Sequence, residues 1–287
     1  MTQECFNISH LDLVFGKNPN KAFNALDAGK SRDQIHKELN QIVAVRKVSF
    51  KVYQGEILVI MGLSGSGKSS LLRCFNGMNG RSHGEVRGTI QFRDPSTQQL
   101  IDIIHCPKNE LMGIRKNKIS MVFQQFGLMP WRTVEENVAY PLEIQKIPIE
   151  EIKKQVAEKL HLVGLSEWKN KFPHELSGGM QQRVGLARAF VTDADVLLMD
   201  EPFSALDPLH RKHLQDEILQ LQYNLKKTII FVTHDFSEAI RIGSRIAIMD
   251  SGNILQIGTA KDLIDKPSCE IVKRFTSDVT LNNPIYS

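Results

Sequence analysis

The chain has 287 residues, and 36 lysines and arginines against 32 aspartates and glutamates give it a formal net charge of +4. With 41% hydrophobic and 24% charged residues it has an ordinary globular composition, which excludes disorder and fibrous structure for the chain as a whole. Its apolar runs are far shorter than the ~20 residues of a membrane-spanning helix. The mild charge forms no basic stripe, which argues against a nucleic-acid partner. The first ten residues carry no apolar core after a basic start, so we expect no secretory signal and a cytoplasmic chain.

Short apolar runs rich in β-branched residues alternate with longer amphipathic segments along the chain. Strands are predicted at 57–61, 119–123, 196–199, 229–232 and 246–249. Thr133 followed by Glu136 has the form of a capping box that opens a helix, and apolar residues at helical spacing from Ile152 to Val163 precede a stop at Gly164. Strands that alternate with helices predict an α/β fold with a mostly parallel sheet covered on both faces.

Three further features stand outside this alternation. Residues 17–41, an Asn-Pro-Asn sequence and then a charged helical stretch, are predicted to be an insertion ahead of the core. The tail after Pro267 contains Asn282-Asn283-Pro284 and is expected to fray at its end. The cysteines form no C-x-x-C pair, which predicts buried or idle reduced thiols and no zinc site. They are Cys5, Cys74, Cys106 and Cys269.

The strongest motif is GLSGSGKS, from Gly62 to Ser69, which fits the phosphate-binding pattern G-x-x-x-x-G-K-[ST] at every fixed position. Its glycines would let backbone N–H groups wrap a phosphate, and the following helix would present its positive end to the same anion. Lys68 would neutralise β- and γ-phosphate charge, and the Ser69 hydroxyl would ligate Mg²⁺. The predicted nucleotide-binding residues are Gly62, Leu63, Ser64, Gly65, Ser66, Gly67, Lys68, Ser69 and Ser70.

A second apolar strand ends in two acids, Asp200 and Glu201. Open α/β sheets bind ligands at the carboxyl ends of their strands, so Asp200 would hold the shell of the magnesium ion. Glu201 would lie one step further out and polarise the attacking water as a general base. Alone, these acids would be interpreted as a solvated strand end. Together with the phosphate-binding loop they form a Walker B strand and predict ATP and Mg²⁺ as cofactors.

The segment LSGGMQQR, which begins at Leu176, lies just before that strand. Its serine can cap a helix whose first N–H groups are freed by two glycines, which makes a second anion-binding helix end. This segment resembles the signature motif of ABC-transporter ATPases. In that family two subunits pair head to tail, and the signature of one closes on the γ-phosphate held by the other. The residues that would act in trans are Ser177, Gly178, Gly179 and Met180.

The other motifs of this family are also found, in family order. Gln124 resembles the Q-loop glutamine, which reaches toward Mg²⁺ and the attacking water, and His234 resembles the switch histidine, which distinguishes ATP from ADP. Ser204, Ala205, Leu206 and Asp207 resemble the D-loop, which communicates across the dimer. The resemblance implies Glu201, His234 and Gln124 as catalytic residues, and Ser69, Gln124 and Asp200 as metal ligands.

The resemblance implies one ABC ATPase domain over about residues 10–265, with a P-loop core, an N-terminal antiparallel β subdomain and a helical subdomain that carries the signature. The expected parts are an ATP-binding core over 1–123 and 186–265 that contains the insertion, a helical subdomain over 124–185, and a C-terminal tail over 266–287. The family usually stacks adenine on an aromatic residue ahead of the first core strand. The candidates here are Phe15, for which ordinary packing is an open alternative, and Leu39.

A narrower resemblance links the chain to ATPases that drive uptake of glycine betaine, proline betaine and choline. It rests on IMGLSGSGK from Ile60, FGLMP from Phe126, the methionine after LSGG, and FSALDPL from Phe203. It implies a homodimeric ATPase, peripheral at the cytoplasmic face of the plasma (inner) membrane, that powers import of a quaternary amine, carnitine included, or a related small solute. The other partners would be a membrane permease and, indirectly, an external solute-binding protein. The 287 residues predict no C-terminal CBS pair, which such ATPases commonly carry.

The permease would dock on the mainly helical segment from Gln124 to Leu176, whose apolar residues suggest a groove for one of its helices. Those residues are Phe126, Leu128, Met129, Pro130 and Trp131. Two alternative functions stay open: an importer ATPase for an amino acid such as histidine, and an ABC ATPase that transports nothing. The second is disfavoured because the chain shows one cassette and no sustained heptads between its motifs.

Overall fold

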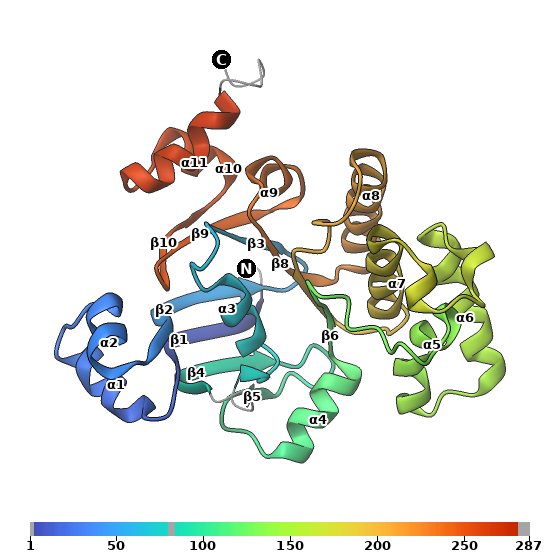
Figure 1. Ribbon diagram of the computed structural model, residues 1–287, viewed down its shortest axis with the longest axis horizontal. Helices are drawn as coiled ribbons and strands as arrows, with labels where there is room; N and C mark the ends of the chain where they lie inside the picture. Colours follow the sequence, from blue (N-terminus) through green and yellow to red (C-terminus); the bar gives the residue numbers. More distant parts are fainter. Residues whose placement is uncertain (1–2, 80–83, 281–287) are drawn as a thin grey trace. The chain divides into compact units, whose positions relative to one another are not determined.

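The computed structural model describes residues 3–79 and 84–280, so the predicted fraying at 282–284 lies outside the described residues. The chain divides into two units, one formed by residues 1–111 and 232–287 and the other by residues 112–231. It passes from one to the other within α4 (Lys108–Asn117) and within β8 (Thr228–Thr233) (Figure 1). The domain boundaries expected from the sequence stay a prediction.

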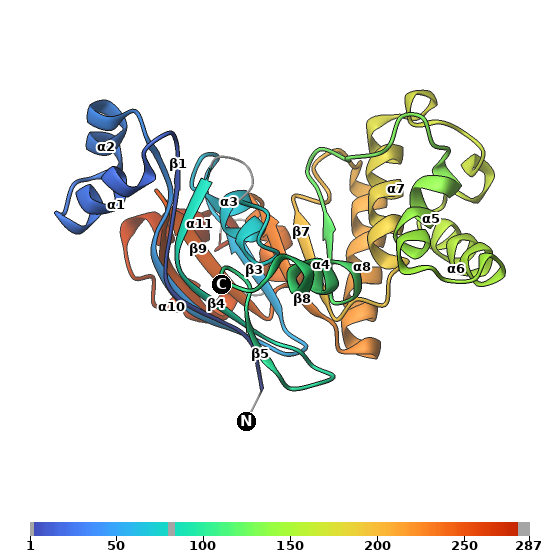
Figure 2. The same ribbon diagram turned by 90° about the horizontal axis from the view of Figure 1, so that it is seen from below.

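The first unit contains an antiparallel sheet with the strand order β2-β1-β4-β5 (Figures 1 and 2). The strands are β1 (Glu4–Phe15), β2 (Ile42–Tyr53), β4 (Gly84–Arg93) and β5 (Leu100–Asp102). The Phe6 ring lies 5.0 Å from both the Phe75 and the Phe92 ring, measured between centroids. These buried rings pack on one face of the sheet, and they confirm that the N-terminal strands form a β subdomain with its own core.

The same unit holds three strands of a second sheet, in the order β10-β9-β3. Their bounds are β3 (Ile57–Met61), β9 (Arg245–Asp250) and β10 (Asn253–Gly258). β3 and β9 run parallel, whereas β10 returns antiparallel to β9. β3 is buried along its whole length, which is why five consecutive apolar residues predict it correctly. The helices of this unit also include α3 (Lys68–Cys74), α9 (Phe236–Ile242), α10 (Ala260–Asp265) and α11 (Glu270–Thr280).

The insertion of residues 17–41 folds into two short helices beside β1 and β2, α1 (Pro19–Asp27) and α2 (Arg32–Leu39) (Figures 1 and 2). A buried apolar cluster joins them to the strands. It consists of Val14, Ala22, Phe23, Ala25, Leu26, Ile35 and Val43. α2 begins with a capping box, because the Ser31 hydroxyl accepts from the Gln34 N–H and the Gln34 side chain accepts from the Ser31 N–H. The insertion is therefore an ordered, packed part of the first unit.

The second unit contains the parallel pair β6 (Ile119–Val122) and β7 (Val196–Asp200), with β8 next to β7. Its helices are α5 (Val134–Gln145), α6 (Ile149–Leu162), α7 (Gly178–Phe190) and α8 (Pro208–Leu225), with short turns η2 (Ser166–Trp168) and η3 (Pro173–Glu175). α5, α6 and α7 pack on one another (Figure 1). The predicted capping box at Thr133 and Glu136 and the stop at Gly164, where φ is +66°, are both present. The predicted α/β class and the mainly helical segment after Gln124 are confirmed.

The C-terminal helix α11 (Glu270–Thr280) corrects one expectation from the sequence. Residues 270–280 were expected to belong to a tail, and the structure folds them into α11, with Val272 and Thr276 buried. α11 packs on the neighbouring helix α10 and on α9, which lies earlier in the chain, so these contacts hold it in place. No helix among the described residues is both long enough and apolar enough to span a membrane.

Candidate functional site

The phosphate-binding loop joins β3 to α3 within the first unit and passes through a narrow space. Gly65 and Gly67 have φ angles of +76° and +104°, which favour glycine. A Cβ atom on Gly62 would lie 2.0 Å from the Met249 carbonyl oxygen, and one on Gly67 would lie 2.2 Å from the Ala44 carbonyl oxygen. The glycine pattern of the motif is therefore required by backbone conformation and by lack of space for a side chain.

The hairpin of β9 and β10 supports this loop. The Gly252 N–H donates to the Ser66 carbonyl oxygen at 2.9 Å. Ser66 is only 3% exposed, and its hydroxyl is buried with no hydrogen-bond partner among the described residues. Buried hydroxyls in folded proteins are nearly always hydrogen-bonded, so this one suits a loop that takes up a polar ligand.

Lys68 begins α3 and is 6% exposed. Its Nζ donates to the carbonyl oxygens of Gly62 at 2.8 Å and Leu63 at 3.0 Å, so the ammonium group lies over the loop. A phosphate would offer it a charged and therefore stronger acceptor. Ser69 and Ser70 follow in the first helical turn, where the Asn79 side chain donates to the Ser70 carbonyl oxygen. The loop residues fit a nucleotide phosphate.

His234, also in the first unit, lies exposed in the turn between β8 and α9. Two hydrogen bonds of Thr233 fix the backbone of this turn. The Thr233 hydroxyl donates to the Glu238 carboxylate at 2.6 Å and accepts from the Asp235 N–H at 3.0 Å. Asp235 in turn caps α9 through its side chain. The backbone that positions the His234 imidazole is thus fixed by hydrogen bonds.

The second unit brings two of the predicted catalytic residues together. β7 ends at Asp200, which is fully buried, and Glu201 follows with a φ of +46°, a left-handed conformation uncommon outside glycine. The Gln124 side chain donates to the Glu201 carboxylate at 3.4 Å. Such backbone outliers persist only where surrounding structure holds them, and they cluster at functional sites.

Sequence reasoning missed the residue that holds Glu201 in this conformation. Gln182, on α7, is 1% exposed, and its side-chain amide donates to the Glu201 carbonyl oxygen at 3.1 Å and accepts from the Ala205 N–H at 2.9 Å. It therefore joins the helix of the predicted signature motif to both the Glu201 segment and the predicted D-loop. Gln181 precedes it, so the local sequence gives no sign of which glutamine is buried.

The signature segment begins α7 as predicted. The Ser177 hydroxyl accepts from the Met180 N–H at 3.3 Å, which makes Ser177 the N-cap. Ser177 and Gly178 are exposed, so the start of the helix is accessible. A Cβ on Gly179 would lie 3.0 Å from the Ala205 carbonyl oxygen, so glycine allows the signature and the D-loop to approach closely.

The predicted D-loop leads from Glu201 into α8. The Ser204 N–H donates to the Glu201 carbonyl oxygen at 3.3 Å, and Leu206 is buried. Asp207 caps α8 by accepting from the N–H groups of Leu209 and His210. Hydrogen bonds from the backbone and the ring of His210 lower the pKa of Asp207. The loop is therefore anchored at both ends.

Arg188, at the end of α7, fixes the segment that follows Gln124. Its guanidinium donates to the carbonyl oxygens of Gly127 at 2.8 Å and Phe126 at 2.9 Å. Burial lowers the pKa of Arg188, and the two carbonyl oxygens partly compensate the buried charge by hydrogen bonding.

A buried amide organises the loop before α5. Asn137 is fully buried, and its Nδ2 donates to the carbonyl oxygens of Met129, Arg132 and Thr133, while its Oδ1 accepts from the Met129 N–H. Within this loop Trp131 is 74% exposed. The structure thus presents a large apolar side chain on a loop with a fixed backbone.

The two candidates for adenine stacking have packing contacts. Phe15 is half-buried at the end of β1, and a Cβ on Gly84 would lie 2.6 Å from its ring. Leu39 packs against the apolar cluster of the insertion. A role for either in binding adenine stays a prediction.

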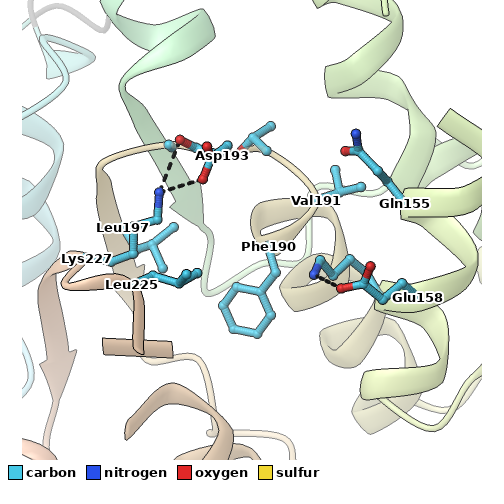
Figure 3. Close-up of a pocket in the computed structure, with 11 residues that line it drawn as sticks. Gln155, Glu158, Phe190, Val191, Asp193, Leu197, Leu225 and Lys227 are labelled. Atoms are coloured by element: carbon cyan, nitrogen blue, oxygen red, sulfur yellow. Dashed lines mark hydrogen bonds and ion pairs between the residues drawn. The ribbon is translucent and has the colours of Figure 1, made fainter. Parts of the chain in front are cut away.

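A cavity of about 320 Å³ in the second unit contains none of the predicted site residues (Figure 3). Its lining comes from α6, the end of α7, the loop that follows, β7, and the segment from α8 to β8. It includes Phe190 of α7 and Leu197 of β7. Lys227 at its edge pairs with Asp193 at 2.7 Å.

All four cysteines are free thiols. Cys5 and Cys74 are buried, and burial raises the pKa of Cys74 to about 12. Cys269 is exposed. Their distribution agrees with the expected buried or idle thiols.

Comparison with known proteins places this geometry in context. A sequence-family model described as ABC transporter matches residues 45–204. The chain is 48% identical over 275 residues to the glycine betaine transport ATP-binding protein OpuAA of Bacillus subtilis, covering 96% of this chain and 63% of that protein. It is 48% identical over 272 residues to the glycine betaine/carnitine transport ATP-binding protein GbuA of Listeria monocytogenes, covering 95% of this chain and 66% of that one. The chain thus spans less than two thirds of the length of these relatives.

A solved structure shares the fold. It is the dimeric post-hydrolysis state of the ATP-binding cassette MJ0796 bound to ADP and Pi, with a TM-score of 0.73 and 28% sequence identity. The match covers 88% of this chain and 98% of that one.

Proposed function

This chain belongs to the ABC transporter family, and we propose that it is the ATP-hydrolysing subunit of an importer for a quaternary amine such as glycine betaine, or a related small solute. The observation that carries this proposal is the phosphate-binding loop. Gly62 and Gly67 have no space for a side chain, Lys68 lies over the loop, and the buried Ser66 hydroxyl has no hydrogen-bond partner among the described residues. These features together suit the phosphates of a nucleotide.

We propose that two copies of the chain bind two ATP molecules between them. Lys68 and Ser69 act on the nucleotide in cis, and the exposed start of α7 at Ser177, Gly178, Gly179 and Met180 acts in trans. The accessibility of Ser177 and Gly178 and the dimeric assembly of MJ0796 support this arrangement. The D-loop residues from Ser204 to Asp207 would carry the signal between the two sites.

Phosphoryl transfer needs positioning and charge stabilisation more than covalent chemistry. Glu201 orients and polarises the attacking water, with Gln124 beside it. His234 contacts the γ-phosphate. Mg²⁺ would neutralise phosphate charge and would be held by Ser69, Asp200 and Gln124, whose hydroxyl, carboxylate and amide oxygens are the hard ligands that this ion takes.

The partner in this proposal is an integral membrane permease, which places the chain at the cytoplasmic face of the plasma membrane. The exposed Trp131, on the loop fixed by Asn137, suits docking to an apolar helix of that partner. An external solute-binding protein would act on the permease. The similarity to OpuAA, a glycine betaine transport ATP-binding protein, and to GbuA, a glycine betaine/carnitine transport ATP-binding protein, supports a quaternary amine as the transported solute.

Two experiments test the proposal. Glu201→Gln keeps the size of the side chain and removes its basicity, so turnover should nearly stop and an ATP-bound dimer should accumulate on size-exclusion chromatography. Wild-type ATP hydrolysis by this variant would contradict the base assignment. Uptake of labelled betaine, choline, carnitine and histidine, compared in a deletion strain with and without this gene, identifies the solute. Uptake of histidine alone would contradict the quaternary-amine assignment.

A further inference from the structure

One side chain of the insertion reaches the phosphate-binding loop. Arg32, the first residue of α2, donates from both Nη1 and Nη2 to the Gly65 carbonyl oxygen at 3.2 Å each. Both residues belong to the first unit, and Arg32 is half-buried. A loop that turns its N–H groups inward around a phosphate turns carbonyl groups outward. A guanidinium bound to such a carbonyl holds the peptide plane in the orientation that a phosphate requires.

The insertion that carries Arg32 is firmly attached to the β-sheet. Arg87, on β4, donates to the Asp12 carboxylate of β1 at 2.7 Å and to the Asp27 carboxylate of α1 at 2.7 Å. Its guanidinium also lies over the Phe23 ring, 4.8 Å from the centroid. Asp12 is only 2% exposed, so this ion pair is buried on the strand side. Arg32 therefore belongs to a helix pair that is fixed to the β-sheet, and not to a mobile loop.

We propose that Arg32 is a positioning residue for the nucleotide: by holding the Gly65 carbonyl oxygen it keeps the loop in its phosphate-receptive conformation. The inference rests on the proposed nucleotide-binding function and adds to it a role for the insertion. Because Arg32 acts on the loop through the Gly65 carbonyl oxygen, it sets nucleotide affinity and leaves the chemical step unchanged.

The test compares Mg²⁺–ADP and Mg²⁺–ATP binding by the purified full chain and its variants, using calorimetry and the KM and kcat of ATP hydrolysis. Arg32→Ala should raise Kd and KM by roughly fivefold to twentyfold, the effect of losing charge-assisted hydrogen bonds that are partly exposed. kcat should change by less than about twofold. Arg32→Lys, which can still donate to the Gly65 carbonyl oxygen, should fall between wild type and Arg32→Ala.

Lys37→Ala is the matched control, because Lys37 is an exposed cation on the same helix. It removes the same charge and should leave Kd unchanged. Hydrogen exchange supplies a readout independent of turnover: amides of residues 62–67 should exchange faster in Arg32→Ala than in Lys37→Ala.

Three results would overturn the proposal. They are an Arg32→Ala Kd close to that of wild type with unchanged exchange in the loop, an equal loss of affinity in Lys37→Ala, and a loss confined to kcat. If the wild-type chain bound neither nucleotide, the proposed function itself would fall, and the role of Arg32 with it.

Discussion

The buried amide of Gln182 offers a sharp test of whether this fold positions Glu201, the proposed catalytic carboxylate. Gln182→Met keeps the length of the side chain and removes both hydrogen bonds, to the Glu201 carbonyl oxygen and from the Ala205 N–H. The Glu201 carbonyl retains a bond from the Ser204 N–H at 3.3 Å, and Ala205 is exposed enough for water to replace part of the second bond. The free energy of unfolding should therefore fall by about 2 kcal/mol, below the sum of two fully buried losses.

The larger effect is expected on catalysis. The left-handed conformation of Glu201 costs on the order of 1 kcal/mol and needs support from its surroundings. Without the amide the segment can relax, and misplacement of a catalytic group by about 1 Å lowers turnover by roughly a hundredfold. We expect kcat for ATP hydrolysis to fall at least about tenfold, measured under conditions in which urea unfolding shows the variant to be folded.

Gln181→Met is the control for this experiment. The Gln181 amide donates to the carbonyl oxygens of Pro173 at 2.9 Å and Leu176 at 3.3 Å, so it is a neighbouring glutamine with similar bonds and no contact with Glu201. Its replacement should lower stability with a much smaller effect on kcat. Equal losses of kcat in the two variants, or wild-type turnover in Gln182→Met, would refute the reasoning.

Three further predictions concern the first unit. Arg87→Met leaves the buried Asp12 carboxylate without its cation and should lower the free energy of unfolding by about 2–4 kcal/mol. This loss is somewhat less than for a fully buried pair, because Arg87 is about a third exposed. An unchanged midpoint of urea unfolding would contradict this prediction. Burial raises the pKa of Glu56 above 4.5, so its ionised form is less favourable in the folded than in the unfolded chain. Its stabilising contribution is therefore present below pH 4.5 and is lost as the pH rises through the folded pKa. Glu56→Gln should gain stability relative to wild type between about pH 4.5 and 7. A loss of stability relative to wild type over this range in urea unfolding would contradict the raised pKa. Thiol reagents at pH 8 should label Cys269 and spare Cys74 in the native protein, and mass spectrometry that finds Cys74 modified before unfolding would disprove its burial.

Features encoded by consecutive residues could be predicted from the sequence. β3 was predicted with its observed ends, because a buried parallel strand is a continuous apolar run. The cap at Ser177 and the box at Thr133 were predicted because side-chain oxygens at these positions satisfy N–H groups two or three residues away. The phosphate-binding loop also belongs to this class.

Features that depend on distant backbone atoms escaped prediction. Arg32 binds a carbonyl oxygen of Gly65, and Gln182 binds backbone groups of Glu201 and Ala205. Every residue has a backbone carbonyl oxygen whatever its side chain. The sequence therefore does not indicate which carbonyl oxygen accepts a hydrogen bond from a given side chain. α11 was not predicted for a related reason, since it is stabilised by packing on other helices, α9 and α10, and not by its local sequence alone.

The loop anchored by Asn137 has a mechanical consequence for the proposed transporter. Three backbone carbonyls converge on one amide, so the segment beneath Trp131 is stiff before any partner arrives. Docking of the permease helix then costs little conformational entropy. A displacement of α5 would move that helix and would not be lost in bending of the loop. Asn137 would thus determine how much of the movement driven by ATP reaches the permease in the lipid bilayer.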